Sequence, residues 1–197
     1  MNFLAHLFLS GPDEEIIIGN FIADAVKGNV INTFSPGIKE GIIQHREIDR
    51  FTDQHPVFLA SCKRLTPNYH KYAGVIVDLY YDHYLSLHWN RYSDKDLHKF
   101  VAAAYKLLIR NFDILPPRSK RILPYMVSQN WLVGYSNLEV LQRVFQGMAR
   151  RTKFNSSMEN AVSDLKQGYH SYEQEFHDFF PDIINHMAEF GKKTHAV

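Results

Sequence analysis

Residues 71–89, KYAGVIVDLYYDHYLSLHW, decide the fold class of this chain. Apolar, aromatic and imidazole side chains recur there at spacings of three and four, at Ile76, Leu79, Tyr80, His83, Tyr84 and Leu87. That period is typical of a largely buried α-helix. The short run VIV alone would suit a strand, but the residues around it follow the helical period. We therefore predict a long helix from Tyr69 to Trp89.

The chain before this segment carries further helix signals. A proline followed by three acidic residues predicts a helix over residues 12–27, and a serine followed by a proline opens another over residues 35–52. Asp53 is placed to cap a short apolar helix over residues 56–65. The first third of the chain is therefore expected to be helical.

The chain after residue 89 also carries signals of helix starts and ends. A serine precedes an acidic residue by three positions, as in a capping box, at Ser93 and Asp96, Ser136 and Glu139, and Ser156 and Glu159. Pro116 and Pro117 separate two of the helices that follow, and Pro181 is expected to kink or end the last. We predict an all-α, single-domain bundle of about seven to nine helices over residues 1–197.

Composition excludes several classes of protein. Of 197 residues, 45% are hydrophobic and 22% are charged, which fits a folded globular chain rather than a disordered one. The formal net charge of +1 is too small for nonspecific nucleic-acid binding, and no run approaches the ~18 apolar residues of a membrane span. A single cysteine, Cys62, and an N-terminal segment without a basic leader predict a cytoplasmic protein.

The stretch QHREIDRFTDQHP, residues 44–56, carries a polar stripe. His45, Asp49 and Asp53 recur every four residues, so on a helix each is rotated by only about 40° from the one before. The stripe is acidic and carries an imidazole, which suits metal binding. Alternatively, the acids pair with neighbouring arginines, and Asp53 serves only as a helix cap.

Other polar residues lie among apolar ones. Asp78 and Asp82 are one turn apart in the long central helix, and His83 adjoins the second. Asp24 and His6 also have apolar neighbours, although each could simply be a hydrogen-bonded core residue. An unpaired buried carboxylate is costly, and a bound cation would remove that cost.

Together these residues form a candidate metal site of nitrogen and oxygen ligands on four helical segments. Its members are His6, Asp24, His45, Asp49, Asp78, Asp82 and His83. Such ligands favour manganese or iron, with magnesium as a further candidate, and the lack of a cysteine cluster argues against finger-type zinc. The alternative is a non-catalytic binding module in which these residues form buried hydrogen-bond networks.

A second histidine and aspartate pair occurs late in the chain. His177 and Asp178 form a literal His-Asp dipeptide, of the kind that names a superfamily of metal phosphohydrolases. The pair lies beside Pro181 and far along the chain from the other candidates. We do not expect it to join the metal site.

Six motifs in order resemble the acyl carrier protein phosphodiesterase family. They are MNFLAHL (1–7), GNFIAD (19–24), GIIQHREIDRFTD (41–53), VDLYYDHYLSLHW (77–89), QNWLVGY (129–135) and QGMARR (146–151). The resemblance implies an all-helical, HD-domain-like metal phosphohydrolase. It further implies removal of 4'-phosphopantetheine from holo acyl carrier protein, with manganese as the favoured metal.

The resemblance also implies roles for individual residues. The expected metal ligands are Asp24, His45, Asp82 and His83. The residues expected to act in catalysis or to complete the ligand shell are His6, Asp49 and Asp78. One departure from the superfamily is that its adjacent His-Asp pair is reversed here, as Asp82-His83.

The implied substrate is an acidic helical protein, so the enzyme needs a basic docking surface. The two candidate clusters are Arg118, Lys120 and Arg121, and Arg150, Arg151 and Lys153. Either cluster could instead be a solvated helix end. Arg46 is a candidate for neutralising the phosphate. An alternative activity is hydrolysis of a nucleotide or another small phosphodiester at the same metal site.

Overall fold

The fold consists of helices, without strands, in residues 1–194, the part of the chain that the computed structural model describes. The α-helices are α1 (Phe3–Leu9), α2 (Glu14–Ile22), α3 (Pro36–Gln54), α4 (Pro56–Tyr69), α5 (Ala73–Leu87), α6 (Leu97–Arg110), α7 (Pro117–Ser128), α8 (Trp131–Gly134), α9 (Leu138–Ala149), α10 (Ala161–Gln167) and α11 (Tyr169–Thr194). Short 3-10 turns join several of them, including η1 (Ala23–Ala25) and η2 (Gly28–Thr33). None of these helices is both long and apolar enough to cross a membrane.

The all-α prediction is confirmed. The described residues hold eleven α-helices rather than seven to nine, because pieces as short as the four residues of α8 and the seven of α10 are too short to show a helical period. The HD-domain-like part of the expectation stays a prediction.

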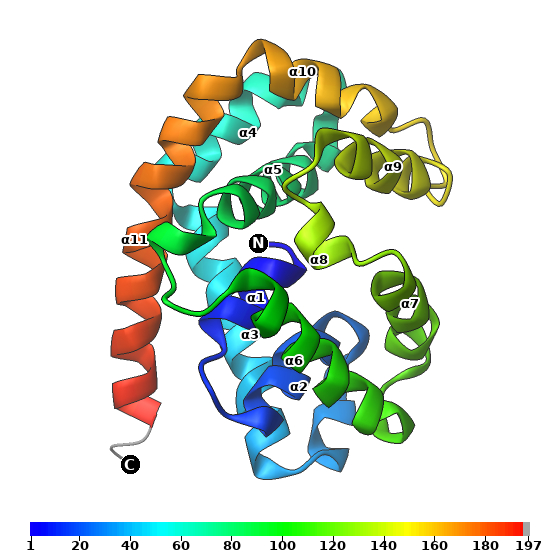
Figure 1. The fold of residues 1–197 in the computed structure, drawn as a ribbon, viewed down its shortest axis with the longest axis vertical. Helices are drawn as coiled ribbons and strands as arrows, with labels where there is room; N and C mark the ends of the chain where they lie inside the picture. Colours follow the sequence, from blue (N-terminus) through cyan, green and yellow to red (C-terminus); the bar gives the residue numbers. More distant parts are fainter. Residues whose placement is uncertain (195–197) are drawn as a thin grey trace.

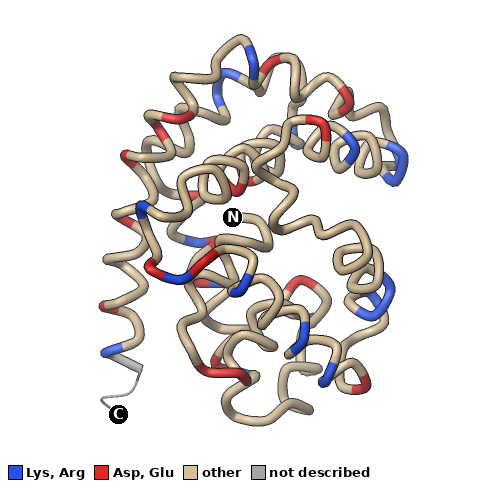
Figure 2. The backbone as a smooth tube through the Cα atoms, viewed as in Figure 1, with Lys and Arg blue, Asp and Glu red and all other residues tan. Residues whose placement is uncertain are grey.

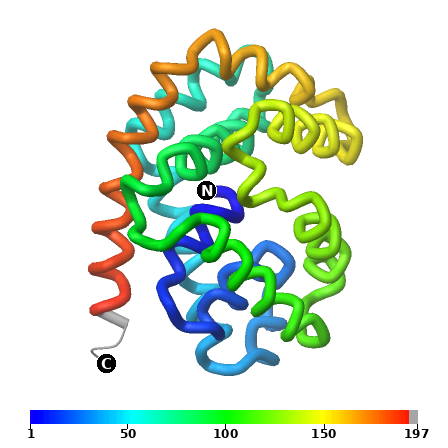
Figure 3. The backbone as a smooth tube through the Cα atoms, in the orientation of Figure 1, coloured from blue at the N-terminus to red at the C-terminus, as the bar shows by residue number. Residues whose placement is uncertain are grey.

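Helix α5 forms the centre of the core. Figure 1 shows it crossing the middle of the molecule, with α11 along one edge. Its side chains Tyr80, Tyr81 and Tyr84 are fully buried, and aromatic residues of α11 such as Phe176 and Phe179 pack against them. In Figure 3 the chain starts beside α5, where Met1 is buried, and the described part ends with α11. The central segment that predicts the fold class is therefore the one that the other helices enclose.

The region after α2 departs from the prediction. α2 ends at Ile22, and the chain continues as the 3-10 turns η1 and η2, so the prediction of one helix over residues 12–27 is wrong beyond Ile22. Lys27 is extended and Gly28 has a φ of 55°, a left-handed conformation that suits glycine. The exposed segment between α2 and α3 therefore turns within a few residues.

The start of α5 also differs from the prediction. α4 runs on to Tyr69, past the expected end at residue 65, and His70 then adopts a positive φ of 48°. A residue with a positive φ interrupts a right-handed helix, so α5 begins at Ala73 rather than at Tyr69.

The helix caps differ from the predicted capping boxes. Asp96 rather than Ser93 caps α6, by accepting a hydrogen bond from the backbone N–H of Lys99, and Asn137 rather than Ser136 caps α9. α10 begins at Ala161 after Asn160, so Ser156 does not cap it. Asp53 lies inside α3, which continues to Gln54, so it does not cap α4. α11 continues through Pro181 instead of ending there.

Two glycines let α2 and α3 approach closely. The Cα atoms of Gly19 and Gly41 face each other across the contact. A Cβ added at Gly19 would lie 2.1 Å from the carbonyl oxygen of Ile38, and one added at Gly41 would lie 2.2 Å from that of Ile16. Backbone atoms cannot rotate away as a side chain can, so any larger residue forces the helices apart.

We expect Gly19→Ala or Gly41→Ala to lower the free energy of unfolding by about 3 kcal/mol, because overpacking displaces a whole helix. Gly74→Ala is the matched control, since an added Cβ there meets nothing within 4 Å and alanine favours a helix. Urea unfolding of the three variants measures the effect. Equal stability of the Gly19 variant and the wild type would show that the helices do not depend on this contact.

Candidate metal-binding site

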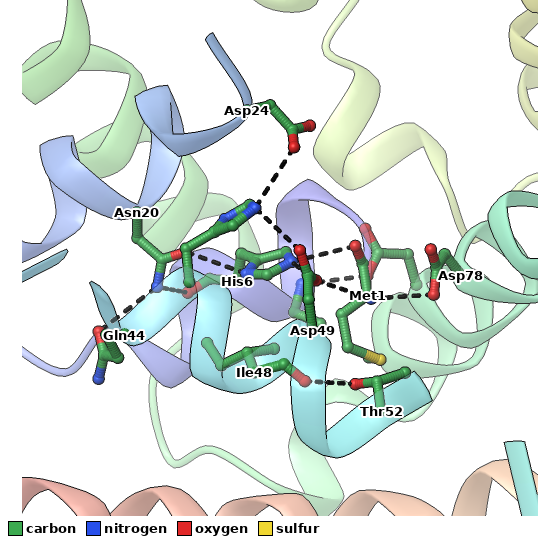
Figure 4. A network of polar contacts seen from close by, with 12 residues as sticks. Met1, His6, Asn20, Asp24, Gln44, Ile48, Asp49, Thr52 and Asp78 are labelled. Atoms are coloured by element: carbon green, nitrogen blue, oxygen red, sulfur yellow. Dashed lines mark hydrogen bonds and ion pairs between the residues drawn. The ribbon is translucent and has the colours of Figure 1, made fainter. Parts of the chain in front are cut away.

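Three polar side chains from two helices meet in the lower half of the molecule. His6 is on α1, and His45 and Asp49 lie one turn apart on α3. The Nε2 atoms of His6 and His45 lie 3.1 Å and 3.2 Å from the two carboxylate oxygens of Asp49. The imidazole rings stack with centroids 3.9 Å apart. We call this arrangement the His-Asp cluster (His6, His45 and Asp49), and Figure 4 shows His6 and Asp49 within it beside Asn20 and Asp24.

Asn20 of α2 fixes the orientation of both rings. Its side-chain oxygen lies 2.9 Å from Nδ1 of His6 and 3.0 Å from Nδ1 of His45. An amide oxygen only accepts hydrogen bonds, so each Nδ1 carries the proton that it donates. In a neutral ring the lone pair is then on Nε2, the atom that faces Asp49.

A short chain of hydrogen bonds fixes Asn20 in turn. The Asn20 side-chain nitrogen donates to the carbonyl oxygen of His6 and to the side-chain oxygen of Gln44. Gln44 donates its own side-chain N–H to the carbonyl oxygen of Leu9 at 3.1 Å. Exchanging the oxygen and nitrogen of either amide would break these bonds, so the network determines the protons of both histidines.

Burial lowers the pKa of a histidine and a neighbouring carboxylate raises it, and the balance differs between His6 and His45. Burial lowers the pKa of His6 to about 4. Burial also acts to lower the pKa of His45, but hydrogen bonds to Asp24 and Asp49 outweigh it and raise that pKa to about 9. Burial acts to raise the pKa of Asp49, yet the hydrogen bond from His45 and the nearby ring of His6 hold it well below its usual range. At neutral pH the cluster thus contains neutral His6 and protonated His45 beside an ionised Asp49.

This arrangement fits a bound cation. The Nε2 atom of neutral His6 has no proton, yet it lies 3.1 Å from both an Asp49 oxygen and the carbonyl oxygen of Met1. A lone pair facing two oxygens is unfavourable unless a positive charge lies nearby, and the amino group of Met1, 3.6 Å from the same Asp49 oxygen, is one such charge. Histidine ligands to metals commonly donate their other ring N–H to an oxygen, as both rings do here to Asn20. The donor set therefore suits a divalent metal.

The carboxylates form the open side of the cluster. The side chains of Asp24 and Asp49 are 63% and 41% exposed, whereas those of His6 and His45 are 4% and 11% exposed. Asp24 in η1 lies 3.5 Å from Nε2 of His45, so it joins the cluster from the solvent side. A substrate would therefore approach across Asp24 rather than through a deep pocket.

Two arginines flank this open side. Arg118, at the start of α7, donates to the backbone oxygen of Asp24 at 3.4 Å. Arg46 on α3 donates to the backbone oxygen of Val26 at 3.3 Å. Both guanidinium groups are thus attached to the segment that carries Asp24, next to the cluster.

Asp82 lies apart from the cluster and caps α1. Its two carboxylate oxygens accept hydrogen bonds from the backbone N–H groups of Leu4 and Ala5, at 2.8 Å and 3.0 Å. These are free N–H groups in the first turn of α1, and the residue before the helix, Asn2, makes no side-chain cap. Burial raises the pKa of Asp82 to about 7 against the effect of these bonds. The N-terminus of α1 therefore compensates this buried carboxylate.

The other two candidates on α5 also have partners of their own. His83 has Nδ1 2.7 Å from the carbonyl oxygen of Tyr135 and Nε2 2.7 Å from the hydroxyl of Tyr169. Asp78 lies 2.9 Å from the amino nitrogen of Met1. Adjacent residues on a helix point about 100° apart, and here Asp82 faces the first turn of α1 while His83 faces Tyr135 and Tyr169. The geometry thus brings together His6, Asp24, His45 and Asp49, and leaves Asp82 and His83 outside that set.

Comparison with known proteins agrees with the motifs. A family model described as acyl carrier protein phosphodiesterase matches residues 1–183. The chain belongs to this family. Curated relatives of that name from Escherichia coli and Salmonella dublin are 34% and 33% identical to it over 195 residues, covering 98% of this chain and 100% of theirs. One from Serratia proteamaculans is 30% identical over 190 residues, covering 96% of this chain and 98% of its own. No solved structure matches the chain significantly.

The sequence of this acyl carrier protein phosphodiesterase family member did not lead us to predict that Asn20 and Gln44 belong to the site. Asn20 is 1% exposed and contacts both histidines. A signal for it was present, because Asn20 stands in an apolar helix one turn before Asp24, within the motif GNFIAD. Gln44 directly precedes His45 and carries no comparable signal.

We expect Asp82→Ala to lower the free energy of unfolding by about 2–4 kcal/mol, because two buried N–H groups lose their acceptors. Asp82→Asn keeps an acceptor oxygen and should cost less. Metal analysis of the purified Asp82→Asn protein should match the wild type, whereas Asp49→Asn should bind less metal. Loss of metal from folded Asp82→Asn would place Asp82 among the ligands.

Proposed function

We propose that this chain is a hydrolase that removes 4'-phosphopantetheine from holo acyl carrier protein with the help of one divalent metal ion. Family membership supplies the substrate class. The observation that carries the metal-dependent part is the convergence of two Nε2 atoms on the Asp49 carboxylate, with both rings fixed by Asn20. Such a group of nitrogen and oxygen atoms on rigid helices supports phosphoester chemistry.

The proposed ligands are His6, His45 and Asp49, with Asp24 closing the exposed side. A divalent cation held by them supplies Lewis acidity toward the phosphoryl group and the attacking water. Two imidazoles with two carboxylates favour manganese or iron, and magnesium remains a candidate at so exposed a site. Asn20 is a positioning residue, because it acts on the substrate only through the two rings.

The reaction exchanges one ester bond for water. The water oxygen forms a bond to phosphorus while the bond between phosphorus and the carrier-protein serine oxygen breaks, and that serine oxygen takes up a proton. The products are apo carrier protein and 4'-phosphopantetheine. The exposed position of Asp24 suits this substrate, because the phosphate is attached to a folded protein that cannot enter a deep cavity.

Arg46 and the basic start of α7 extend the site toward the substrate. Arg46 lies on α3 one residue after His45, where its charge can neutralise the phosphate. Arg118 reaches the backbone of Asp24, so the α7 basic cluster (Arg118, Lys120 and Arg121) borders the open side. The α9 basic cluster (Arg150, Arg151 and Lys153) follows α9, and Figure 2 shows blue stretches of chain near α7 and near the end of α9 at separate places along one edge. Because of the Arg118 contact, we assign docking of the acidic carrier protein to the α7 basic cluster.

Incubation of holo carrier protein with the purified enzyme and manganese should yield apo carrier protein, identified by its lower mass. We expect Asp49→Asn and His45→Gln to lower kcat by about 100-fold or more, because each loses a metal ligand. Asp53→Asn is the matched control, since Asp53 lies one turn further along α3 and is exposed. A chelator should abolish activity and manganese should restore it. An Asp49→Asn enzyme as active as the wild type would contradict the assignment.

Reversing the charges of the α7 basic cluster to glutamate should raise KM for holo carrier protein about tenfold and weaken its dependence on salt. The physical reason is the loss of attraction to an acidic partner. The same reversal in the α9 basic cluster is the control and should leave KM unchanged. Steady-state kinetics at low and moderate salt measure both. A KM that rises only with the α9 variant would move the docking surface there.

A further inference from the structure

A second group of metal-binding side chains lies where the end of α5 meets the start of α11. His88 follows α5 directly, and Glu173 and His177 lie one turn apart on the same face of α11. Nε2 of His88 lies 2.6 Å from a carboxylate oxygen of Glu173, and the rings of His88 and His177 have centroids 4.8 Å apart. Figure 1 shows the chain after α5 turning beside α11 at this point.

We propose that His88, Glu173 and His177 form a second divalent metal site, of the kind that takes zinc. One ligand atom from each of the three residues lies within 4.8 Å of the others. In a tetrahedral zinc site with bonds of about 2.1 Å the ligand atoms are about 3.4 Å apart. Small rotations of these half-buried side chains therefore close the site around an ion.

The groups at this site are suited to binding a cation. Glu173 contacts both His88 and, at 3.4 Å, the exposed ring of His170. The carboxylate and the rings around it place oxygen and nitrogen ligand atoms side by side. Arg91 and Asp178 flank His177 with opposite charges. A zinc ion would use the lone pairs and the carboxylate together.

Tyr92 orients the third ligand. Its hydroxyl oxygen lies 2.7 Å from Nδ1 of His177. When that hydroxyl oxygen accepts a hydrogen bond from the Nδ1–H group, the lone pair of His177 is on Nε2 and is available to a metal ion. His170, whose side chain is 96% exposed, is one turn before Glu173 and can provide a fourth ligand or leave that position to water.

The second site differs from the His-Asp cluster in its chemistry and in its effect. It shares no residue with that cluster, and its two or three imidazoles with one carboxylate favour zinc over magnesium. Glu173 and His177 belong to α11 and His88 to the end of α5, so a bound ion links the two helices. Zinc is thus expected to stabilise the fold without taking part in hydrolysis.

Zinc titration of the full chain after removal of bound metal tests the proposal. The wild type should bind one more zinc ion than His177→Gln, and the affinity of that second site should fall by about 100-fold or more in the variant. Zinc should raise the melting temperature of the wild type by more than that of His177→Gln. His88→Gln should behave like His177→Gln, since each removes one ligand.

Two further variants make the result decisive. His98→Gln, which removes an exposed histidine of α6, should bind as much zinc as the wild type. Asp49→Asn should lose zinc at the His-Asp cluster but keep the zinc that His177→Gln lacks. Equal zinc stoichiometry in the wild type and in His177→Gln, with the zinc-free melting temperatures showing that both are folded, would overturn the second site. Zinc binding that Asp49→Asn abolishes entirely would do the same.

Discussion

The close approach of α2 and α3 at Gly19 and Gly41 sets the geometry of the His-Asp cluster. With no side chain at either position, the two backbones touch, and Ile38 and Ile16 present carbonyl oxygens where a Cβ would lie. Asn20 is the residue after Gly19, and His45 is one turn after Gly41. The 3.0 Å hydrogen bond between them follows from the contact, because helices held further apart could not form it.

One amide oxygen then determines the chemistry of two histidines. Because Asn20 accepts from both Nδ1 atoms, the two Nε2 atoms face the same carboxylate. Stacking at 3.9 Å disfavours a positive charge on both rings at once, in keeping with pKa values of about 4 for His6 and about 9 for His45. A proton on His45 and a metal ion at the cluster are therefore alternatives. The fold provides a place for positive charge, and the ligand atoms decide which cation suits it.

The helical period predicts the fold class and most of α3 and α5, because apolar spacing depends on the local chain alone. The pairing of His45 with Asp49 is predictable for the same reason, since four residues make about one turn on any helix. The role of Asp82 as a helix cap is not predictable in this way, because the period of α5 does not show which helix packs against each face of α5. In the folded chain that neighbour is the first turn of α1. Asn20 and the two glycines act through contacts between helices, which spacing along one helix cannot reveal, whereas the family motifs pointed to the region without assigning the contacts.

The cap that Asp82 provides for α1 has a consequence for how the protein matures. A helix of seven residues does not persist in isolation, and the acceptors for its first turn lie 77 and 78 residues further along the chain. During synthesis, α1 therefore lacks its cap until α5 has left the ribosome and packed against it. His6 reaches its final position only then, so a nascent chain shorter than about this length does not yet hold the complete His-Asp cluster.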